Sequence, residues 1–168
     1  MPKKTIQIDF KKSCQCLIIA RQTYEFVMAQ FINDAQTDPQ RAAKAPTLFN
    51  FALACELFLK VIYASENNYK IPATHDLESI FNTLADTTKS EVKKSFESNP
   101  QRKKLLLSTT KFEGLLSQTK DIFEKYRYAF ENIDEIKKDN KHGDYIFFLC
   151  IFAQALNRYI QDNITHGL

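Results

Sequence analysis

Apolar residues recur every three or four positions along most of this chain, which is the spacing of one face of an α-helix. The pattern predicts a first helix over residues 10–35 and a second, with a wider apolar face, over residues 46–65. Asp38-Pro39 separates the two, and Pro72 follows the end of the second. Further helices are expected over residues 75–85, 87–98, 111–131 and 144–162. The charged stretch 133–144 is interpreted as ending in a loop at His142-Gly143-Asp144.

These elements predict an all-α fold: an up-down helical bundle with four main helices and one or two short ones. The chain has 168 residues, with 3 glycines and 5 prolines, too few turn residues for a β-rich fold. It shows no internal repeat or low-complexity tract. We therefore expect a single domain spanning residues 1–168.

Charge and cysteine content narrow the functional classes. The net charge is +3, from 23 basic and 20 acidic residues, which permits contact with nucleic acid without predicting it. The four cysteines include no Cys-x-x-Cys pair, so a zinc site is not expected and no cofactor is predicted. Cys55 and Cys150 lie in apolar stretches and are interpreted as small core residues.

The apolar stretches of the sequence indicate where in the cell the protein is expected. The longest, residues 145–156, has about 12 residues, whereas a membrane span needs roughly 20. The first residues lack the apolar core of a secretion signal. Together with reduced thiols, this favours a cytoplasmic protein that does not contact a membrane.

Polar residues interrupt two predicted core faces. Glu56 and Lys60 lie four residues apart in an otherwise apolar stretch, in the favourable order for a helical ion pair. They form either a partly buried structural pair or a charged group held at a cleft. His75 follows a proline-containing loop and precedes Asp76; it is either a residue of the helix start or a proton shuttle.

A third polar group lies in the predicted helix 111–131. Arg127 and Glu131 are again four residues apart, among aromatic residues. An arginine between aromatic rings can stack on them and pair with a carboxylate or a phosphate. We expect a polar network of Glu56, Lys60, Arg127 and Glu131, which could be structural or functional. His75 and Asp76 are the further predicted members of this site.

The order of these groups resembles the HEPN-domain family. The resemblance lies in the run Glu56-Leu57-Phe58-Leu59-Lys60, then His75-Asp76-Leu77, then Arg127-Tyr128 with Glu131; the matched blocks fall between Ala52 and Glu131. It implies a helical bundle that often forms a homodimer. Many members are metal-independent ribonucleases of toxin–antitoxin or phage-defence systems, and others bind RNA or partner proteins without catalysis.

Active members of that family share an arginine, four to six residues, and then a histidine. Here Arg127 is followed by no histidine until His142, and seven residues separate Arg158 from His166. His166 also lies two residues from the C-terminal residue. The resemblance therefore implies the fold of the family for this chain, but not its reaction. Arg158 and His166 remain candidates for a stretched form of the motif.

Three functions follow as hypotheses. The first is a non-catalytic HEPN-like domain that binds RNA or a partner protein in a bacterial defence or stress system. The second is a metal-independent ribonuclease with a rearranged site, in which His75 is the acid or base and Arg127 holds the phosphate, while Glu56 or Glu131 orients His75. The third is a structural dimerisation module whose polar network sets helix register.

Overall fold

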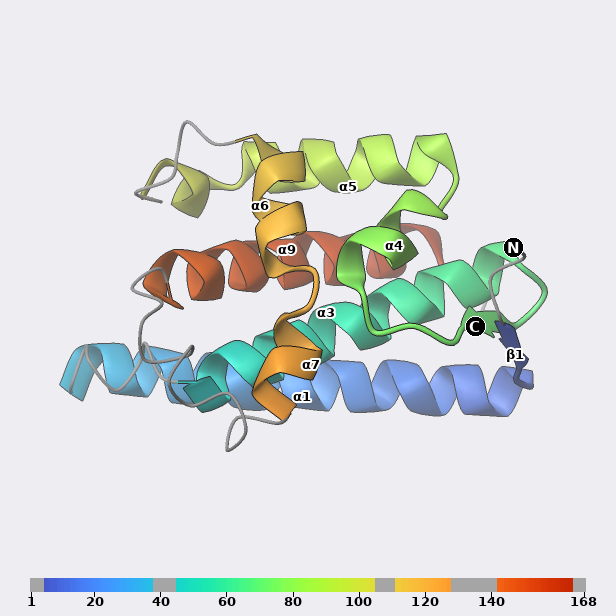
Figure 1. Cartoon of the computed structure of the whole chain (residues 1–168), viewed down its shortest axis with the longest axis horizontal. Helices are drawn as coiled ribbons and strands as arrows, with labels where there is room; N and C mark the ends of the chain where they lie inside the picture. The colour runs from blue at the N-terminus through green and yellow to red at the C-terminus, as the bar shows by residue number, and fades with distance from the viewer. Residues whose placement is uncertain (1–4, 38–44, 105–110, 128–141, 165–168) are drawn as a thin grey trace.

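The computed structural model describes residues 5–37, 45–104, 111–127 and 142–164 (Figure 1). Helices make up most of these residues, so the prediction of an all-α class is confirmed. The only β-structure in the described ranges is one pair of three-residue strands.

Four long helices form the body of the protein: α1 (Phe10–Thr37), α3 (Ala45–Glu66), α5 (Asp86–Ser98) and α9 (His142–Asn163). Figure 1 shows them side by side in the order α1, α3, α9, α5, with contacts between each adjacent pair. Each long helix runs opposite to the one that precedes it in the sequence. The last helix thus lies between α3 and α5.

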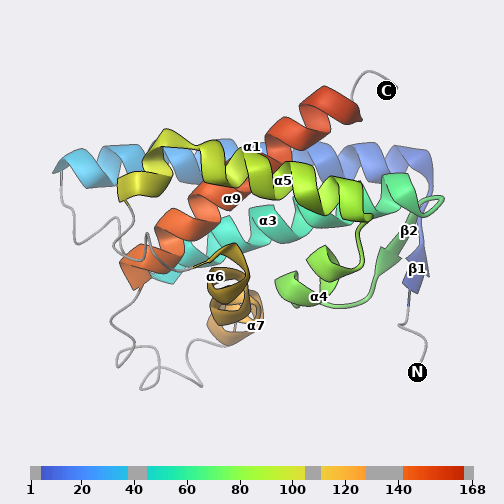
Figure 2. The same ribbon diagram turned by 90° about the horizontal axis from the view of Figure 1, so that it is seen from above.

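Three short α-helices, α4 (Leu77–Asn82), α6 (Phe112–Thr119) and α7 (Ile122–Arg127), cover one side of this body. A short 3-10 helix, η1 (Pro100–Lys104), follows α5. Figure 2 shows α4, α6 and α7 on the side of α3 that faces away from α1. They contact α3 and α9 and bring the His75 loop and α7 to the same flank of α3.

The core is rich in aromatic rings. Phe148 and Phe152 of α9 stack at 5.6 Å, and Phe152 also contacts Phe81 of α4 and Phe112 of α6. Phe96 of α5 packs on Phe112 and Phe148. These rings tie the short helices to α9, and their burial is the main favourable contribution to folding.

The two strands are a feature that the apolar pattern does not predict. β1 (Thr5–Gln7) pairs antiparallel with β2 (Lys70–Pro72), with Ile6 opposite Ile71. Asn68 and Tyr69 precede β2 with φ of 51° and 59°, the left-handed region in which a chain leaves a helix. The pair joins the chain before α1 to the chain after α3.

Three sequence predictions of helix boundaries are wrong. The helix expected over residues 111–131 is divided into α6 and α7 at Lys120-Asp121, because the Lys120 carbonyl accepts a hydrogen bond from Leu77 N at 3.0 Å. The loop expected at His142-Gly143-Asp144 is the first turn of α9. His75 also lies in the loop before α4, which begins at Leu77 instead of residue 75.

Within the described residues, one helix is long and apolar enough to cross a membrane. It is the Pro46–Glu66 stretch of α3, in which an 18-residue window has a mean hydropathy of 1.5. However, 67% of that window is buried inside the protein. That is the pattern of the core helix of a soluble protein, and the cytoplasmic location stays a prediction.

Candidate functional site

A buried carboxylate lies at the centre of the first candidate site. Glu56 is surrounded by apolar residues of α3 and is only 3% exposed. Its Oε1 accepts a hydrogen bond from Lys60 Nζ at 2.7 Å and lies 2.9 Å from His75 Nδ1. A charge removed from water needs such partners, because desolvation otherwise makes the ionised form costly.

Lys60 follows Glu56 by one helical turn, so local helix geometry brings the two side chains together. The Lys60 side chain is 14% exposed. Its charge also acts on α1: burial raises the pKa of the Cys16 thiol above its ordinary value, and the Lys60 charge opposes that rise. The predicted pair is therefore present, in a largely buried position between α1 and α3.

The loop between β2 and α4 brings His75 to the same carboxylate. The His75 ring stacks on Phe123 of α7 at 5.0 Å, and Phe123 stacks in turn on Phe49 of α3 at 5.0 Å. The histidine side chain is 38% exposed, whereas Glu56 beneath it is buried. One ring edge is thus bound to a carboxylate, one ring face is packed, and part of the ring is open to solvent.

This arrangement gives His75 a defined chemistry. A neutral ring that donates its Nδ1 proton to Glu56 keeps Nε2 as the free acceptor. A histidine oriented by a buried carboxylate can accept a proton or donate a hydrogen bond to a phosphate. Sequence reasoning paired these residues only as a hypothesis, because 19 positions separate them.

The second carboxylate oxygen of Glu56 has a different environment. Oε2 is buried and, within the described part of the chain, has no hydrogen-bond partner. Buried polar atoms normally have one, so this oxygen can accept a further donor. The site therefore has unused hydrogen-bonding capacity directly beside His75.

Asp76 does not join this network. Its Oδ1 accepts a hydrogen bond from Ser79 N at 2.6 Å, which makes Asp76 the N-cap of α4. Its own N–H donates to Thr74 Oγ1 at 3.1 Å. Asp76 thus fixes the loop that presents His75, and its contribution is local.

The other predicted members of the network are only partly placed. Arg127 is the last residue of α7, one turn after Phe123, so the two positions share a face of that helix. The Arg127 side chain and the whole of Glu131 lie outside the described parts. Phe49 and Phe123 are members that sequence reasoning assigned only to apolar faces, because aromatic residues at helical spacing usually mark a core.

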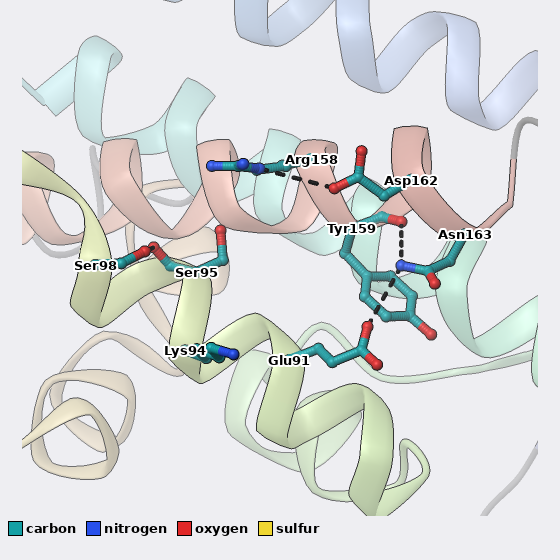
Figure 3. Close-up of a pocket in the computed structure, with 8 residues that line it drawn as sticks. All are labelled: Glu91, Lys94, Ser95, Ser98, Arg158, Tyr159, Asp162 and Asn163. Carbon is teal, nitrogen blue, oxygen red and sulfur yellow. Dashed lines mark hydrogen bonds and ion pairs between the residues drawn. The ribbon is translucent and has the colours of Figure 1, made fainter.

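A second candidate site is a groove between α5 and α9, with a volume of about 230 Å³ (Figure 3). Arg158 lies on its rim with its side chain 72% exposed, and its Nε is 3.7 Å from Asp162 Oδ2. Tyr159 is anchored by a 2.9 Å contact between its hydroxyl and that of Thr88. The groove is lined by Glu91, Lys94, Ser95, Ser98, Arg158, Tyr159, Asp162 and Asn163.

Charges of both signs line this groove, so it does not form a basic surface. Lys94 and Arg158 are balanced by Glu91 and Asp162. His166, the other half of the stretched motif, lies outside the described parts. The polar stripe on α5 opposite its apolar positions is the sequence signal that could have located the groove.

Among the described residues, no group of three or more histidine, cysteine or acidic side chains could hold a metal ion. No protein-family model, curated protein or solved structure matches this chain. The resemblance to HEPN domains therefore rests on the sequence motifs, and the His75 site is argued from its own geometry.

Proposed function

We propose that this chain is a HEPN-like, non-catalytic domain that binds RNA through the surface around His75, in a bacterial defence or stress system of the toxin–antitoxin kind. The observation that carries the proposal is the contact between His75 and the buried Glu56. It supports the proposal because the Glu56–Lys60 and His75 motifs, distant in the sequence, meet at one partly exposed place. The HEPN-like bundle and the homodimer belong to the same proposal.

RNA recognition at this site has a specific physical basis. A histidine held in place loses little conformational freedom when it contacts a phosphate or a base. The entropy cost of ordering its side chain therefore offsets little of the interaction energy. Arg127, one turn beyond the ring on which His75 stacks, supplies the cation for a neighbouring phosphate.

The proposal is non-catalytic because the chain departs from the family motif. Arg158, the arginine of the stretched pair, faces Asp162 across one helical turn and lines the groove with α5. That exposed pairing is typical of a solvated surface ion pair.

One observation favours a second candidate, a metal-independent ribonuclease. A base bound to an orienting carboxylate is the arrangement that general base catalysis requires. In this reaction the ribose 2′-hydroxyl attacks the phosphorus and its proton passes to His75 Nε2. The 5′-oxygen leaves and takes a proton from water, which gives a 2′,3′-cyclic phosphate and a 5′-hydroxyl. Arg127 stabilises the charge on the phosphate.

One experiment tests both candidates. Labelled structured RNA is incubated with protein in excess chelator and examined for gel shift and for cleavage. The wild type is compared with His75→Ala, Arg127→Ala and Arg158→Ala; the last is a matched control, since it removes an exposed arginine from another site. We expect a shift without cleavage, with affinity about tenfold weaker in the first two variants and unchanged in the control.

Each alternative outcome has a definite meaning. Cleavage that is lost in His75→Ala and Arg127→Ala would replace the binding domain with the ribonuclease. Cleavage lost in Arg158→Ala alone would identify the stretched motif as the active one. Absence of both shift and cleavage would reject RNA as the ligand and leave a protein partner or the structural module.

A further inference from the structure

The strand β1 has an open edge. All three of its residues are exposed, and among the described residues β2 is its only hydrogen-bonded neighbour. Figure 2 shows the two strands at one end of the molecule, beside the start of α1 and the end of α3. An unpaired strand edge is a ready template for another strand, because its backbone donors and acceptors point outward.

The register of the strand pair decides which backbone groups the open edge presents. Ile8 N donates a hydrogen bond to Tyr69 O at 2.9 Å. Hydrogen-bonded and non-hydrogen-bonded pairs alternate along an antiparallel ladder, so Ile6, two positions earlier, is also bonded to β2. The N–H and C=O groups of Thr5 and Gln7 therefore point away from β2. No other described residue supplies a partner for these four groups.

The opposite edge of the pair is closed. Pro72 of β2 is buried and has no N–H to donate, and β2 contacts α3. The N–H of Lys70, which also points away from β1, is already bonded to Asn67 O at 3.1 Å. Of the two described strands, only β1 can therefore accept a further strand.

Apolar side chains surround the open edge. Ile6 is half exposed, and Phe10 and Tyr69, which pack edge to face at 5.9 Å, are also exposed. Exposed apolar residues that lie singly are normal, but three beside an unpaired strand suit the alternate side chains of an added strand. The edge thus offers both main-chain and side-chain contacts.

The charges near the edge are mainly positive. Lys11, Lys12 and Lys70 are exposed, and they form no ion pair with any described residue. Asp9 is the acid of this stretch, and its Oδ1 accepts a hydrogen bond from Lys12 N at 2.7 Å. The first turn of α1 holds two of the lysines and no acid, although the helix macrodipole favours acids there. A segment that carries carboxylates complements this charge.

We infer that β1 docks an extended acidic segment of a partner protein, which adds to the sheet as a third strand. The backbone of that segment bonds to the outward groups of Thr5 and Gln7, and its carboxylates lie beside Lys11 and Lys12. Main-chain hydrogen bonds supply affinity in strand addition, and complementary charge selects the partner. This docking site is separate from the RNA surface around His75 and does not depend on it.

A peptide titration tests the inference. The probe is a fluorescent octapeptide of alternating glutamate and valine, added to the full chain and followed by anisotropy. We expect a dissociation constant on the order of 10–100 µM. One control peptide carries a methyl group on every amide nitrogen, and a second has lysine in place of glutamate. Each should bind at least ~10-fold more weakly, because the first lacks backbone donors and the second has the wrong charge.

Variants of the chain separate the backbone contribution from the charge contribution. Thr5→Pro removes an outward N–H and leaves the bonds to β2, whereas Thr5→Val keeps that N–H and is the matched control. Lys11→Glu with Lys12→Glu reverses the local charge, and Lys94→Glu changes an exposed lysine of α5 as its control. We expect about tenfold weaker peptide binding in Thr5→Pro and in the double variant, and wild-type binding in both controls.

Amide hydrogen exchange locates the bound peptide. At saturation, exchange of the Thr5 and Gln7 N–H groups should slow by about tenfold or more, because they become hydrogen-bonded. The Ile6 N–H, already bonded to β2, should change less. Circular dichroism of each variant verifies that the helices are retained.

Four results would overturn the inference. The first is no binding of the octapeptide up to about 1 mM. The second is equal binding of the fully methylated peptide, or protection of amides elsewhere in the chain. The third is retention of a short single-stranded RNA by Lys11 and Lys12 without retention of the octapeptide, which would make this a nucleic-acid surface. The fourth is self-association that Thr5→Pro abolishes, which would make the occupant a second copy of this chain.

Discussion

At the scale of single residues, Glu56 shows how one buried charge can organise a site. Its carboxylate is bound by Lys60 from its own helix and contacts His75 from a distant loop. The spacing of four residues predicts the first contact, because helix geometry alone brings the side chains together. The second contact depends on where the β2–α4 loop packs, so sequence reasoning reaches it only as a hypothesis about function.

The buried pair makes a stability prediction. Glu56→Ala should lower the free energy of unfolding by about 3 kcal/mol, because it leaves the largely buried Lys60 without its partner. The measurement is urea denaturation followed by far-UV circular dichroism. Replacement of both residues, Glu56→Leu with Lys60→Met, should recover most of the loss, since no unpaired charge then remains.

The matched control is Glu113→Gln, which breaks an ion pair with Lys93 at an exposed position. Surface pairs of this kind contribute less than about 1 kcal/mol. If Glu56→Ala were no more destabilising than this control, the structural account of the Glu56 network would be wrong.

At the scale of elements, hydrogen bonds between distant segments decide where helices end. Residues 111–131 have the apolar spacing of one helix, yet α6 and α7 are separate. The Lys120 carbonyl accepts a hydrogen bond from Leu77 N instead of one from the next helical turn. The first N–H groups of a helix need partners, and α4 finds one in that carbonyl. A local pattern does not contain this competition, since the two groups are far apart in sequence.

Helix caps give a prediction with two opposite signs. Asp76→Ala removes the side chain that accepts a hydrogen bond from Ser79 N and should lower the free energy of unfolding by about 1 kcal/mol.

Ala85, at the N-cap of α5, makes no side-chain cap bond, so Ala85→Ser should raise the free energy of unfolding by about 0.5 kcal/mol. Thermal unfolding of both variants measures the changes; a fall in melting temperature for Ala85→Ser would contradict the prediction.

At the scale of the whole molecule, the position of α9 determines the core. It lies between α3 and α5, so that its residues are buried on nearly every side through its first half. Cys150 of α9 and Cys55 of α3 are both buried free thiols, as their apolar surroundings predict. Because these thiols are buried in the folded state, the stability of the fold depends on pH.

Stability should therefore fall at alkaline pH. Burial raises the pKa of the Cys150 thiol to about 12 and the pKa of Cys55 well above its ordinary value of 9.0. Above pH 9 the unfolded chain loses thiol protons that the folded chain keeps, so the stability present below pH 9 is lost as the pH rises. Each thiol contributes a slope of about 1.4 kcal/mol per pH unit in that window.

The measurement is urea denaturation at several pH values between 8 and about 10.5, the lower part of the window in which the thiol contribution changes. Cys150→Ala should have a shallower slope than the wild type, whatever its absolute stability. Cys14→Ala, at a half-buried position on α1, is the control and should keep the wild-type slope. Equal slopes in all three proteins would show that the buried thiols do not set alkaline stability.

Local sequence patterns were enough to predict the helical class, the helices α1, α3, α5 and α9 and the Glu56–Lys60 pair, because each depends on residues within a few turns of one another. The tertiary structure alone decided the strand pair, the break after α6 and the place of α9. It also decided that His75 meets Glu56. These features depend on which distant segments pack together, and packing depends on the shapes of all the faces at once.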